Sequence, residues 1–419
     1  MNILVIGSGG REHALFRKLM ESPQTDKIYA IPGNPGMGEM TDISMEDNAA
    51  ILNFAKEKEI GLVVVGPEVP LMNGLVDELE SAGIRAFGPR ANAAEIEGSK
   101  SFAKDLMKKY GIPTARYEVF TEAEPARAYI RREGAPIVVK ADGLAAGKGV
   151  IVAMSEQEAL DAVNAIMEDN SFGDAGARVV IEEFMEGEEA SLLAFTDGKT
   201  IRPMISAQDH KRAFDGDKGP NTGGMGTYAP APVMTPEMID RATEEILKPT
   251  LAAMAKEGRP YSGCLYLGLM ITVEGPKVVE FNARFGDPET QVVLPLLDGD
   301  LVQIMCACAD GTLADVPIHW KDGAAVCVVL VAGGYPAAYE KGNEIHGIAD
   351  AEKTGALVFH AGTAAKEGKL VTNGGRVLGV VGMGEDIASA VRSAYAAVEK
   401  ISFKDAYYRK DIAHRALHR

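Results

Sequence analysis

The sequence predicts an α/β protein with an N-terminal doubly wound parallel sheet, a central α+β region and a small strand-rich C-terminal domain. Three observations support this fold class. Apolar strand segments alternate with amphipathic helical segments over residues 2–95, short strands group around one helix in residues 114–195, and strands again dominate residues 324–419. Strands separated by helices of this length are typical of parallel sheets covered by helices on both faces.

The chain has 419 residues, enough for two to four domains, and its pattern divides into four parts. We expect an N-terminal α/β phosphate-binding domain (1–100), a small lid module (101–195), a central module with a metal site (196–323) and a strand-rich C-terminal domain (324–419). The sequence contains no internal repeat.

In the first domain, short apolar segments predict strands at "NILVIG", "KIYAIPG", "GLVVVGPE" and "IRAFGP". Between them, "REHALFRKLME", "NAAILNFAKEKEI" and residues 74–82 predict helices. A short apolar run bounded by glycine or proline is typical of a buried strand, whereas apolar residues three or four positions apart indicate a helix. The alternation predicts parallel strands.

The second domain opens with a predicted helix over residues 100–110. Ser99 can cap its first turn, and Gly111 followed by Pro113 ends it. Beyond this helix, "IVVKA", "GVIVA" and "RVVIEEF" predict strands around a helix near 156–168.

The third part is predicted to hold a helix over residues 236–256 and, before it, the longest irregular loop of the chain, residues 215–236. Structureless loops of this length inside compact domains are usually functional or disordered. This loop contains Tyr228 and two methionines rather than a charged low-complexity tract. We therefore expect it to be functional. The last part should end with a helix near 385–400.

Composition narrows the classes of function. A net charge of −17 and a pI near 5.0 disfavour binding to nucleic acid or to a membrane surface. The start lacks a signal-peptide pattern, and the longest apolar run, from Ala324, is too short to span a bilayer. Four cysteines without a CxxC pair predict reduced, buried thiols, and seven scattered histidines predict no zinc site. We expect a cytoplasmic protein.

The segment "VIGSGGREHAL" predicts an anion site made of backbone N–H groups at the start of a helix. A dinucleotide fingerprint needs a third glycine where Glu12 stands, and an acid at the end of the second strand, which reads "AIPGNPG". NAD is therefore disfavoured, and a single phosphate beside Arg11 fits better. A tight turn without a ligand is the alternative.

Two segments indicate a polyphosphate site. In "VVKADGLAAGKGVIV", Lys140 and Lys148 flank a glycine-rich loop that could close over phosphates, although a hairpin with solvated lysines would look similar. In "RVVIEEFMEGEEASLLAF", a strand runs into Glu182 and Glu183. This pattern suggests a hinge whose backbone pairs with adenine and whose acid takes the ribose hydroxyls, and a solvated charged face is the alternative.

The segment "VVEFNARFGDPETQ" carries the most distinctive pattern. Glu280, Asn282 and Arg284 alternate with apolar residues, so in a strand they share one face. A carboxylate and an amide supply the oxygen ligands that Mg²⁺ prefers. An arginine next to them can reach a phosphoryl group during transfer. A solvated strand face is again the alternative.

These segments, with "GPEVPL", "QDHKR", "GPNTGGMG" and "RFGDPETQV", resemble the glycinamide ribonucleotide synthetase family (phosphoribosylamine–glycine ligases) of the ATP-grasp superfamily, over essentially the whole chain. "RFGDPETQ" and "GPNTGGMG" are specific to that family. The fold it implies has ATP-grasp α+β modules in the centre.

By matched positions the resemblance implies several sites. The ATP site comprises Lys100, Lys140, Lys148, Glu182, Glu183, Phe184, Met185, Glu189, Arg212 and Asn221; the substrate site comprises Gly9, Gly10, Arg11, Glu12, Pro67, Glu68, Asp209, Lys211, Asp287 and Pro288; the metal site comprises Glu280 and Asn282; and Arg284 and Lys148 are catalytic. Within these sets, Asp209 would lie near the glycine amine, Glu189 at the ribose and the two N-terminal segments at the phosphoribosyl group.

The activity that the resemblance implies belongs to purine biosynthesis. ATP would phosphorylate the carboxylate of glycine, and 5-phosphoribosylamine would attack the glycyl phosphate, giving glycinamide ribonucleotide, ADP and phosphate. ATP and Mg²⁺ or Mn²⁺ are the expected cofactors and small molecules the expected partners. The oligomeric state is left open, with a monomer as the working expectation. Many ATP-grasp proteins carry a further metal-binding acid, and here Leu269 stands about where that acid is expected.

Two alternatives stay open. Another ATP-grasp enzyme, such as a biotin-carboxylase-like subunit or a peptide-type ligase, would share the nucleotide site without "RFGDPETQ". A nucleotide-binding sensor without turnover would need neither Lys148 nor the set Glu280, Asn282 and Arg284.

Overall fold

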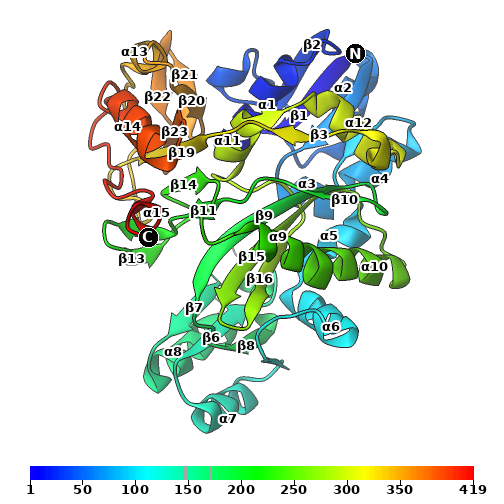
Figure 1. Cartoon of the computed structure of the whole chain (residues 1–419), viewed down its shortest axis with the longest axis vertical. Helices are drawn as coiled ribbons and strands as arrows, with labels where there is room; N and C mark the ends of the chain where they lie inside the picture. The colour runs from blue at the N-terminus through cyan, green and yellow to red at the C-terminus, as the bar shows by residue number, and fades with distance from the viewer. Residues whose placement is uncertain (145–148, 170–171) are drawn as a thin grey trace.

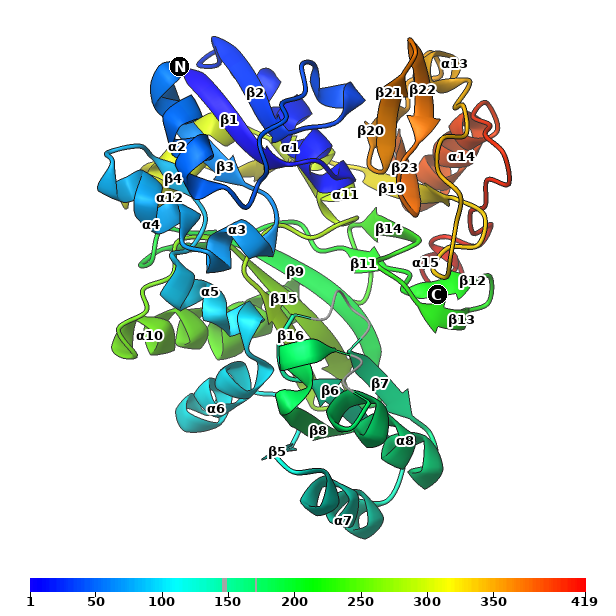
Figure 2. The ribbon, with the colours of Figure 1, turned by 180° about the vertical axis from the view of Figure 1, so that it is seen from behind.

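The computed structural model describes residues 1–144, 149–169 and 172–419, and four groups of strands organise it (Figure 1). A parallel N-terminal sheet and the C-terminal strands lie side by side at one end, the long central strands follow, and the lid module lies at the other end (Figures 1 and 2). The α/β fold class expected from the sequence is confirmed.

The N-terminal sheet has the strand order β2-β1-β3-β4, with every pair parallel. Its elements are β1 (Asn2–Gly7), α1 (Gly10–Met20), β2 (Lys27–Pro32), α2 (Asn48–Glu57), β3 (Ile60–Val65), α3 (Glu68–Met72), α4 (Leu75–Ser81), β4 (Ala86–Phe87) and α5 (Ala91–Gly98). Each predicted strand and helix of this region is present. Gly7 at the end of β1 and Gly66 just after β3 both lie against Glu12 in the first turn of α1. The segment predicted to bind a phosphate therefore lies at one edge of the sheet.

Helix α6 (Lys100–Tyr110) leads into the lid module. Its first turn is capped by Ser99, whose Oγ accepts a hydrogen bond from the Phe102 N–H at 3.1 Å, and Gly111 ends it in the left-handed conformation. The lid sheet has the order β5-β8-β6-β7. It comprises β5 (Tyr117–Phe120), α7 (Ala123–Glu133), β6 (Ile137–Ala141), β7 (Val150–Ala153), α8 (Glu156–Met167) and β8 (Val179–Glu183). An apolar cluster of its own holds this module together.

The central sheet has the order β10-β9-β15-β16 and is antiparallel. Its strands are β9 (Glu188–Thr196), β10 (Ile201–Pro203), β15 (Gly263–Thr272) and β16 (Gly275–Asn282), covered by α9 (Pro236–Ala242), a π-helical turn (Thr243–Leu247) and α10 (Lys248–Lys256). The helix predicted over 236–256 is therefore continuous, with one wider turn inside it. After β16 come α11 (Thr290–Val293), β17 (Leu297–Asp298), α12 (Leu301–Asp310) and β18 (His319–Trp320).

The C-terminal sheet has the order β11-β14-β19-β23-β20, so two of its strands come from the middle of the chain. Its strands are β11 (Gln208–Asp209), β14 (Gly226–Ala229), β19 (Ala324–Val331), β20 (Leu357–His360) and β23 (Arg376–Gly384). The same part of the chain contains α13 (Ile348–Glu352), α14 (Ile387–Val398), α15 (His414–Leu417) and a separate two-stranded sheet of β21 (Thr363–Lys366) and β22 (Lys369–Thr372). The pairing of β14 with β19 ties residues 208–229 to the last third of the chain.

The expectation of an irregular loop over residues 215–236 was wrong. Strands β12 (Arg212–Phe214) and β13 (Lys218–Asn221) form an antiparallel hairpin, called here the 212–221 hairpin, and β14 follows it. Glycine- and proline-rich sequence hid this pattern because strand propensity is low in the hairpin itself. Cross-strand pairing and the neighbouring C-terminal segment supply the order instead.

One apolar cluster joins the N-terminal sheet, the central sheet and the segment after β16. Phe87, Phe195 and Phe285 come from the N-terminal sheet, the central sheet and the segment after β16, and their ring centroids lie 5.9–6.4 Å apart. Aromatic rings at such distances stabilise one another beyond simple burial. The four cysteines are free, as expected. Among the described residues, no helix has the length and apolarity needed to cross a bilayer.

Candidate active site

The two side chains predicted to bind metal lie on one face of the central sheet. Glu280 and Asn282 of β16 stand opposite Gly268 and Tyr266 of β15 in the antiparallel register. Directly opposed residues share a face of a sheet. A Cβ added at Gly268 would approach Cγ of Glu280 to 3.0 Å, so the glycine leaves space for this carboxylate.

The structure corrects the place of the further acid. Leu269 is fully buried in the apolar core, and its side chain points away from Glu280, because successive residues of a strand face opposite sides. The residue aligned with Glu280 is Gly268. The expected position at Leu269 was therefore wrong by one residue, and the aligned position bears no side chain.

The metal-binding capacity of this face follows from its donors. Across residues 1–144, 149–169 and 172–419, no three His, Cys, Asp or Glu side chains gather closely enough to hold an ion. Glu280 and Asn282 would offer one carboxylate and one amide oxygen. Mg²⁺ is commonly held by one or two protein oxygens, with water and substrate phosphates completing its octahedron, so this donor set fits such an ion.

Arg284 lies between β16 and the N-terminal domain. Its guanidinium pairs with Glu68 at 3.1 Å and with Glu97 at 2.9 Å, and its Nη2 donates to Oδ1 of Asn282 at 3.3 Å. Burial by itself would lower the pKa of Arg284. The nearby carboxylates of Glu97 and Glu68 outweigh this effect and raise the pKa above its ordinary value. The structure thus brings Arg284, Asn282 and Glu68 together.

The N-terminal turn is held by its own acid. Both oxygens of the buried Glu12 carboxylate are engaged: Oε2 accepts from the Gly9 N–H at 2.7 Å and Oε1 from Nε of Arg11 at 2.5 Å. A Cβ at Gly7 or Gly66 would collide with this side chain. Arg11 also donates to the Phe285 carbonyl at 3.2 Å. The turn is therefore shaped internally, and the Arg11 guanidinium is occupied by protein groups.

The acidic turn after β16 contacts the N-terminal turn. Oδ2 of Asp287 accepts from the Arg11 N–H at 3.2 Å, and its Oδ1 lies 3.3 Å from Nη1 of Arg376. Burial would raise the pKa of Asp287, but Arg376 and Arg11 outweigh it and lower that pKa. Arg376 also donates to the Gly223 carbonyl at 2.7 Å, and a Cβ at Gly224 would strike Pro288. The two family-specific segments thus meet at Arg376.

Lys140 joins the lid sheet to β16. Its Nζ lies 2.9 Å from Oε1 of Glu182 and donates to the Val279 carbonyl at 3.2 Å. The second partner of Glu182 is the buried Lys104, at 3.1 Å. Burial would raise the pKa of Glu182, but Lys140 and Lys104 outweigh it and lower that pKa. Desolvation lowers the pKa of Lys104 to about 8.

Lys100 and the hinge complete this side. Nζ of Lys100 donates to the Gly143 carbonyl at 2.7 Å, and burial lowers its pKa while attraction to Glu280 opposes the decrease. Glu183 accepts from the Arg116 N–H at 3.0 Å and ends β8. Phe184 and Met185 follow, linking β8 to β9, where Gly187 has φ +159°. Lys148, predicted to act from the lid, lies outside the described residues.

Asp209, Lys211 and Glu189 form a charged group beside the central sheet. Nζ of Lys211 donates to Oε2 of Glu189 at 2.7 Å. Burial raises the pKa of Asp209 to about 7; Lys211 opposes this rise, and Glu289 and Glu189 add to it. Glu289 in turn accepts from the Tyr266 hydroxyl at 3.0 Å. Asp209 is therefore placed to change charge near neutral pH.

Arg212 and Asn221 are direct cross-strand partners in the 212–221 hairpin. The Arg212 guanidinium is exposed and donates to the Gly219 carbonyl at 2.8 Å, and Asn221 is half-buried. The structure thus brings these two predicted phosphate contacts side by side, although nine residues separate them in the chain.

Comparison with known proteins decides the family. Residues 1–97, 98–290 and 325–415 match the N, ATP-grasp (A) and C domains of phosphoribosylglycinamide synthetase. The chain is 54% identical, over 100% of its length and 99% of the relative's, to a phosphoribosylamine–glycine ligase of Agrobacterium fabrum. The chain belongs to the phosphoribosylglycinamide synthetase family. The family expected from the sequence is thereby confirmed.

Solved structures agree with this membership. A phosphoribosylamine–glycine ligase from Thermotoga maritima superposes with a TM-score of 0.87 and 38% identity, covering 99% of this chain and 100% of that one. The biotin carboxylase domain of a Hydrogenobacter thermophilus 2-oxoglutarate carboxylase gives a TM-score of 0.70 at 16% identity, covering 100% of this chain and 98% of that one. The second likeness is one of fold alone.

Three charged residues of this synthetase-family site, two of them buried and one half-buried, escaped the sequence analysis. Glu97 pairs with Arg284, Lys104 with Glu182, and Arg376 with Asp287. Glu97 and Lys104 lie in helical segments whose charged residues resemble solvated ones, and Arg376 follows two glycines at the start of a strand. A buried partner distant in sequence gives no local signal, so only the fold reveals these residues.

Proposed function

We propose that this chain joins glycine to 5-phosphoribosylamine at the cost of ATP, giving glycinamide ribonucleotide, ADP and phosphate. The observation that carries the proposal is similarity over the full length to phosphoribosylamine–glycine ligases, at 52–55% identity in three of them. Full-length similarity matters because the N-terminal turn, the nucleotide site and β16 must all be present for one active site.

The nucleotide would lie between the lid sheet and the central sheet. Lys100 and Lys140 would contact its phosphates, the backbone from Glu182 through Glu183, Phe184 and Met185 its adenine, and Glu189 its ribose. Support comes from the converging positions of Lys100, Lys140 and Glu280, whose charges influence one another. Magnesium or manganese held by Glu280 and Asn282 would neutralise charge on the phosphates.

Glycine would bind with its carboxylate toward the γ-phosphate and its ammonium toward Asp209, with Lys211 nearby. One carboxylate oxygen of glycine attacks the γ-phosphorus, the bond to the β-phosphate oxygen breaks, and ADP leaves. Arg284 would stabilise the transferred group, since positioned cations act mainly on charge that develops during transfer. A carboxylate becomes a good acyl donor only when one oxygen is converted into such a leaving group.

The amine of 5-phosphoribosylamine then attacks the acyl carbon, the carbon–oxygen bond breaks, and inorganic phosphate departs with one former glycine oxygen while the nitrogen loses a proton. Gly9, Gly10, Arg11 and Glu12, Pro67 and Glu68, and Asp287 and Pro288 would hold the phosphoribosyl group. Since the Arg11 guanidinium already contacts Glu12 and Phe285, its part here would be to shape the turn, leaving backbone donors for the phosphate.

The decisive experiment combines product analysis with isotope transfer. Release of ADP should require both glycine and 5-phosphoribosylamine. Glycine with ¹⁸O in its carboxylate should deliver one labelled oxygen to each phosphate formed. Unlabelled phosphate, or AMP among the products, would contradict the glycyl phosphate route. Activity with bicarbonate and biotin in place of glycine would favour the carboxylase alternative.

A further inference from the structure

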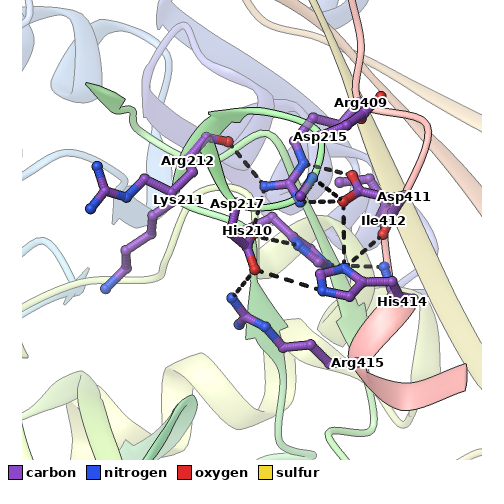
Figure 3. Close-up of polar contacts among 12 residues, drawn as sticks. His210, Lys211, Arg212, Asp215, Asp217, Arg409, Asp411, Ile412, His414 and Arg415 are labelled. Carbon is purple, nitrogen blue, oxygen red and sulfur yellow. Dashed lines mark hydrogen bonds and ion pairs between the residues drawn. The ribbon is translucent and has the colours of Figure 1, made fainter. Parts of the chain in front are cut away.

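The C-terminal segment, residues 409–415, lies directly against the 212–221 hairpin (Figure 3). Arg409 makes the central contacts. Its Nη1 donates to the carbonyl oxygen of Arg212 at 3.1 Å and to Oδ1 of Asp217 at 3.0 Å. Its Nε and Nη2 donate to the two carboxylate oxygens of Asp411, each at 2.8 Å. One guanidinium thus joins the backbone of the hairpin to the C-terminal segment.

The contacts of Arg409 are unusually constrained for a side chain so close to the end of the chain. Arg409 is fully buried. Asp217, a non-glycine residue with φ +54°, turns its carboxylate inward, where Arg415 also donates to it at 2.7 Å. Asp411 accepts from the Gly216 N–H at 2.9 Å. Bidentate arginine–carboxylate pairs fix orientation as well as distance, so the turn of the hairpin has one defined place.

The orientation of the neighbouring side chains connects this network with the nucleotide site. In Figure 3 the side chains of Lys211 and Arg212 point away from Arg409, while the carbonyl group of Arg212 faces it. His210 points the opposite way and accepts at Nε2 from the Ala413 N–H at 3.0 Å. The chain therefore places His210 and the Arg212 carbonyl on the side of the C-terminal segment, and the Lys211 and Arg212 side chains on the other side.

We propose that Arg409 is a positioning residue of the nucleotide site: through the Arg212 carbonyl and Asp217 it fixes the hairpin so that the Arg212 and Asn221 side chains lie beside the ATP phosphates. This inference rests on the proposed function, because it deepens the nucleotide site of that function. Asn221 is the cross-strand partner of Arg212, so a shift of the hairpin moves both groups together.

A purely structural role would have a different signature. A buried charge network can hold two segments together without any effect on ligands, and its loss would then lower the melting temperature only. A positioning role predicts weaker nucleotide binding by protein that is still folded. Displacements near 1 Å in binding groups remote from the reacting atoms can cost up to a hundred-fold in rate.

The test uses four variants of the full chain. Arg409→Met removes every contact, and Arg409→Lys keeps the charge without the fork. Arg415→Met removes a second cation from Asp217 but leaves the Arg212 carbonyl bound. Lys404→Met, which removes an exposed ion pair with Glu340 in the same part of the chain, is the matched control. Each is assayed well below its own melting temperature.

Two measurements are made on every variant: ATP affinity by calorimetric titration without glycine, and kcat/KM for ATP and for glycine. For Arg409→Met we expect roughly ten-fold weaker ATP binding and a ten-fold or greater loss of kcat/KM for ATP, with the KM for glycine changed less than about two-fold. Arg409→Lys should lie between Arg409→Met and wild type. Arg415→Met should lose less than Arg409→Met, and Lys404→Met should match wild type.

Wild-type ATP affinity in folded Arg409→Met, or in folded Arg409→Lys should the first variant not fold, would overturn the proposal. So would an equal loss for ATP and glycine, which indicates general loosening of the site. Because the titration needs no turnover, its result stands even when the ligase assay fails, and the two proposals can be refuted separately.

Discussion

The N-terminal turn "GSGGRE" and the strand end "EFNAR" each carry an acid close to an arginine, but the structure uses the two acids differently. Both carboxylate oxygens of Glu12 accept hydrogen bonds from the turn itself. The carboxylate of Glu280, by contrast, makes no hydrogen bond or ion pair with any residue that the structure describes. The carboxylate of Glu12 holds the N-terminal turn in shape, whereas the oxygens of Glu280 remain available to a ligand.

The difference can be traced to the backbone. Gly7 and Gly66 crowd Glu12 from two strand ends, so its side chain has a single location. Gly268, opposite Glu280, removes a side chain where an ion would lie. The glycines beside Glu12 thus let it fit tightly into the turn, whereas the glycine opposite Glu280 leaves open space beside its carboxylate. The sequence motif alone does not distinguish these two arrangements.

The largest expected effect tests the half-buried Glu280. Glu280→Gln replaces a charged oxygen ligand and should reduce kcat/KM by roughly 10²–10³ at fixed magnesium, similar to the loss of one preorganised group at developing charge. The magnesium concentration for half-maximal rate should rise with it. Glu274→Gln, at the exposed turn of the same β-hairpin, serves as control. A magnesium titration of Glu280→Gln that matches wild type would contradict a metal-binding role and favour the alternative, a solvated strand face.

The next effect tests the confined acid. Glu12→Gln removes one partner of the buried pair with Arg11 and should lower the free energy of unfolding by about 3 kcal/mol, because the guanidinium is left without its counter-charge. Urea denaturation measures this change. Glu352→Gln, which breaks an exposed pair with Arg17, should cost less than about 1 kcal/mol. Unchanged stability of Glu12→Gln, with loss of acceptor binding, would make Glu12 a ligand rather than a support.

These two regions also show which features of the fold could be predicted from the sequence. Strand alternation was enough to place Glu280 and Asn282 on one face, and the cap at Ser99 and the stop at Gly111 were readable because helix ends depend on local residues. The 212–221 hairpin could not be predicted from local sequence, because it is held in place by Arg409 and Asp411, nearly two hundred residues away in the chain. Glu97 and Arg376 were missed for the same physical reason.

The position of Leu269 also depends on a contact that the local sequence does not reveal. The strand itself was predicted, but a register shift between β15 and β16 decides which of its residues faces Glu280. A shift of one residue turns every side chain to the other face, and the hydrogen-bond register is a property of two strands rather than of one. The sequence of one strand therefore does not show which of its residues lies opposite a given residue of the neighbouring strand.

A smaller effect distinguishes the role of Arg284 from the proposed metal-binding role of Glu280 and Asn282. Arg284→Lys keeps the charge but cannot bridge Glu68 and Glu97 with one planar fork. Turnover should fall roughly ten-fold, in line with the value of one charge-assisted hydrogen bond, while the magnesium midpoint stays near that of wild type. Steady-state rates at graded magnesium measure both. A shifted midpoint with normal turnover would assign Arg284 to the metal site.

The smallest expected effect concerns the pH dependence of glycine use. Burial raises the pKa of Asp209 to about 7, with Lys211 opposing the rise. If the charged carboxylate binds the glycine ammonium, then protonation below this pKa removes the attraction. Between pH 8 and pH 6.5, the ionised fraction of a group with this pKa falls about four-fold, and kcat/KM for glycine should fall with it while kcat/KM for ATP changes less.

Asp209→Asn provides the control for this pH dependence, and the sign of its stability effect is fixed by linkage. A carboxyl whose pKa is raised on folding stabilises the fold below its unfolded pKa near 4, and this stabilisation is lost as the pH rises through about 7. Asp209→Asn should therefore melt above wild type at pH 8 and close to it at pH 5, while using glycine poorly at every pH. A variant that keeps the wild-type fall in kcat/KM for glycine between pH 8 and 6.5 would assign that titration to another group.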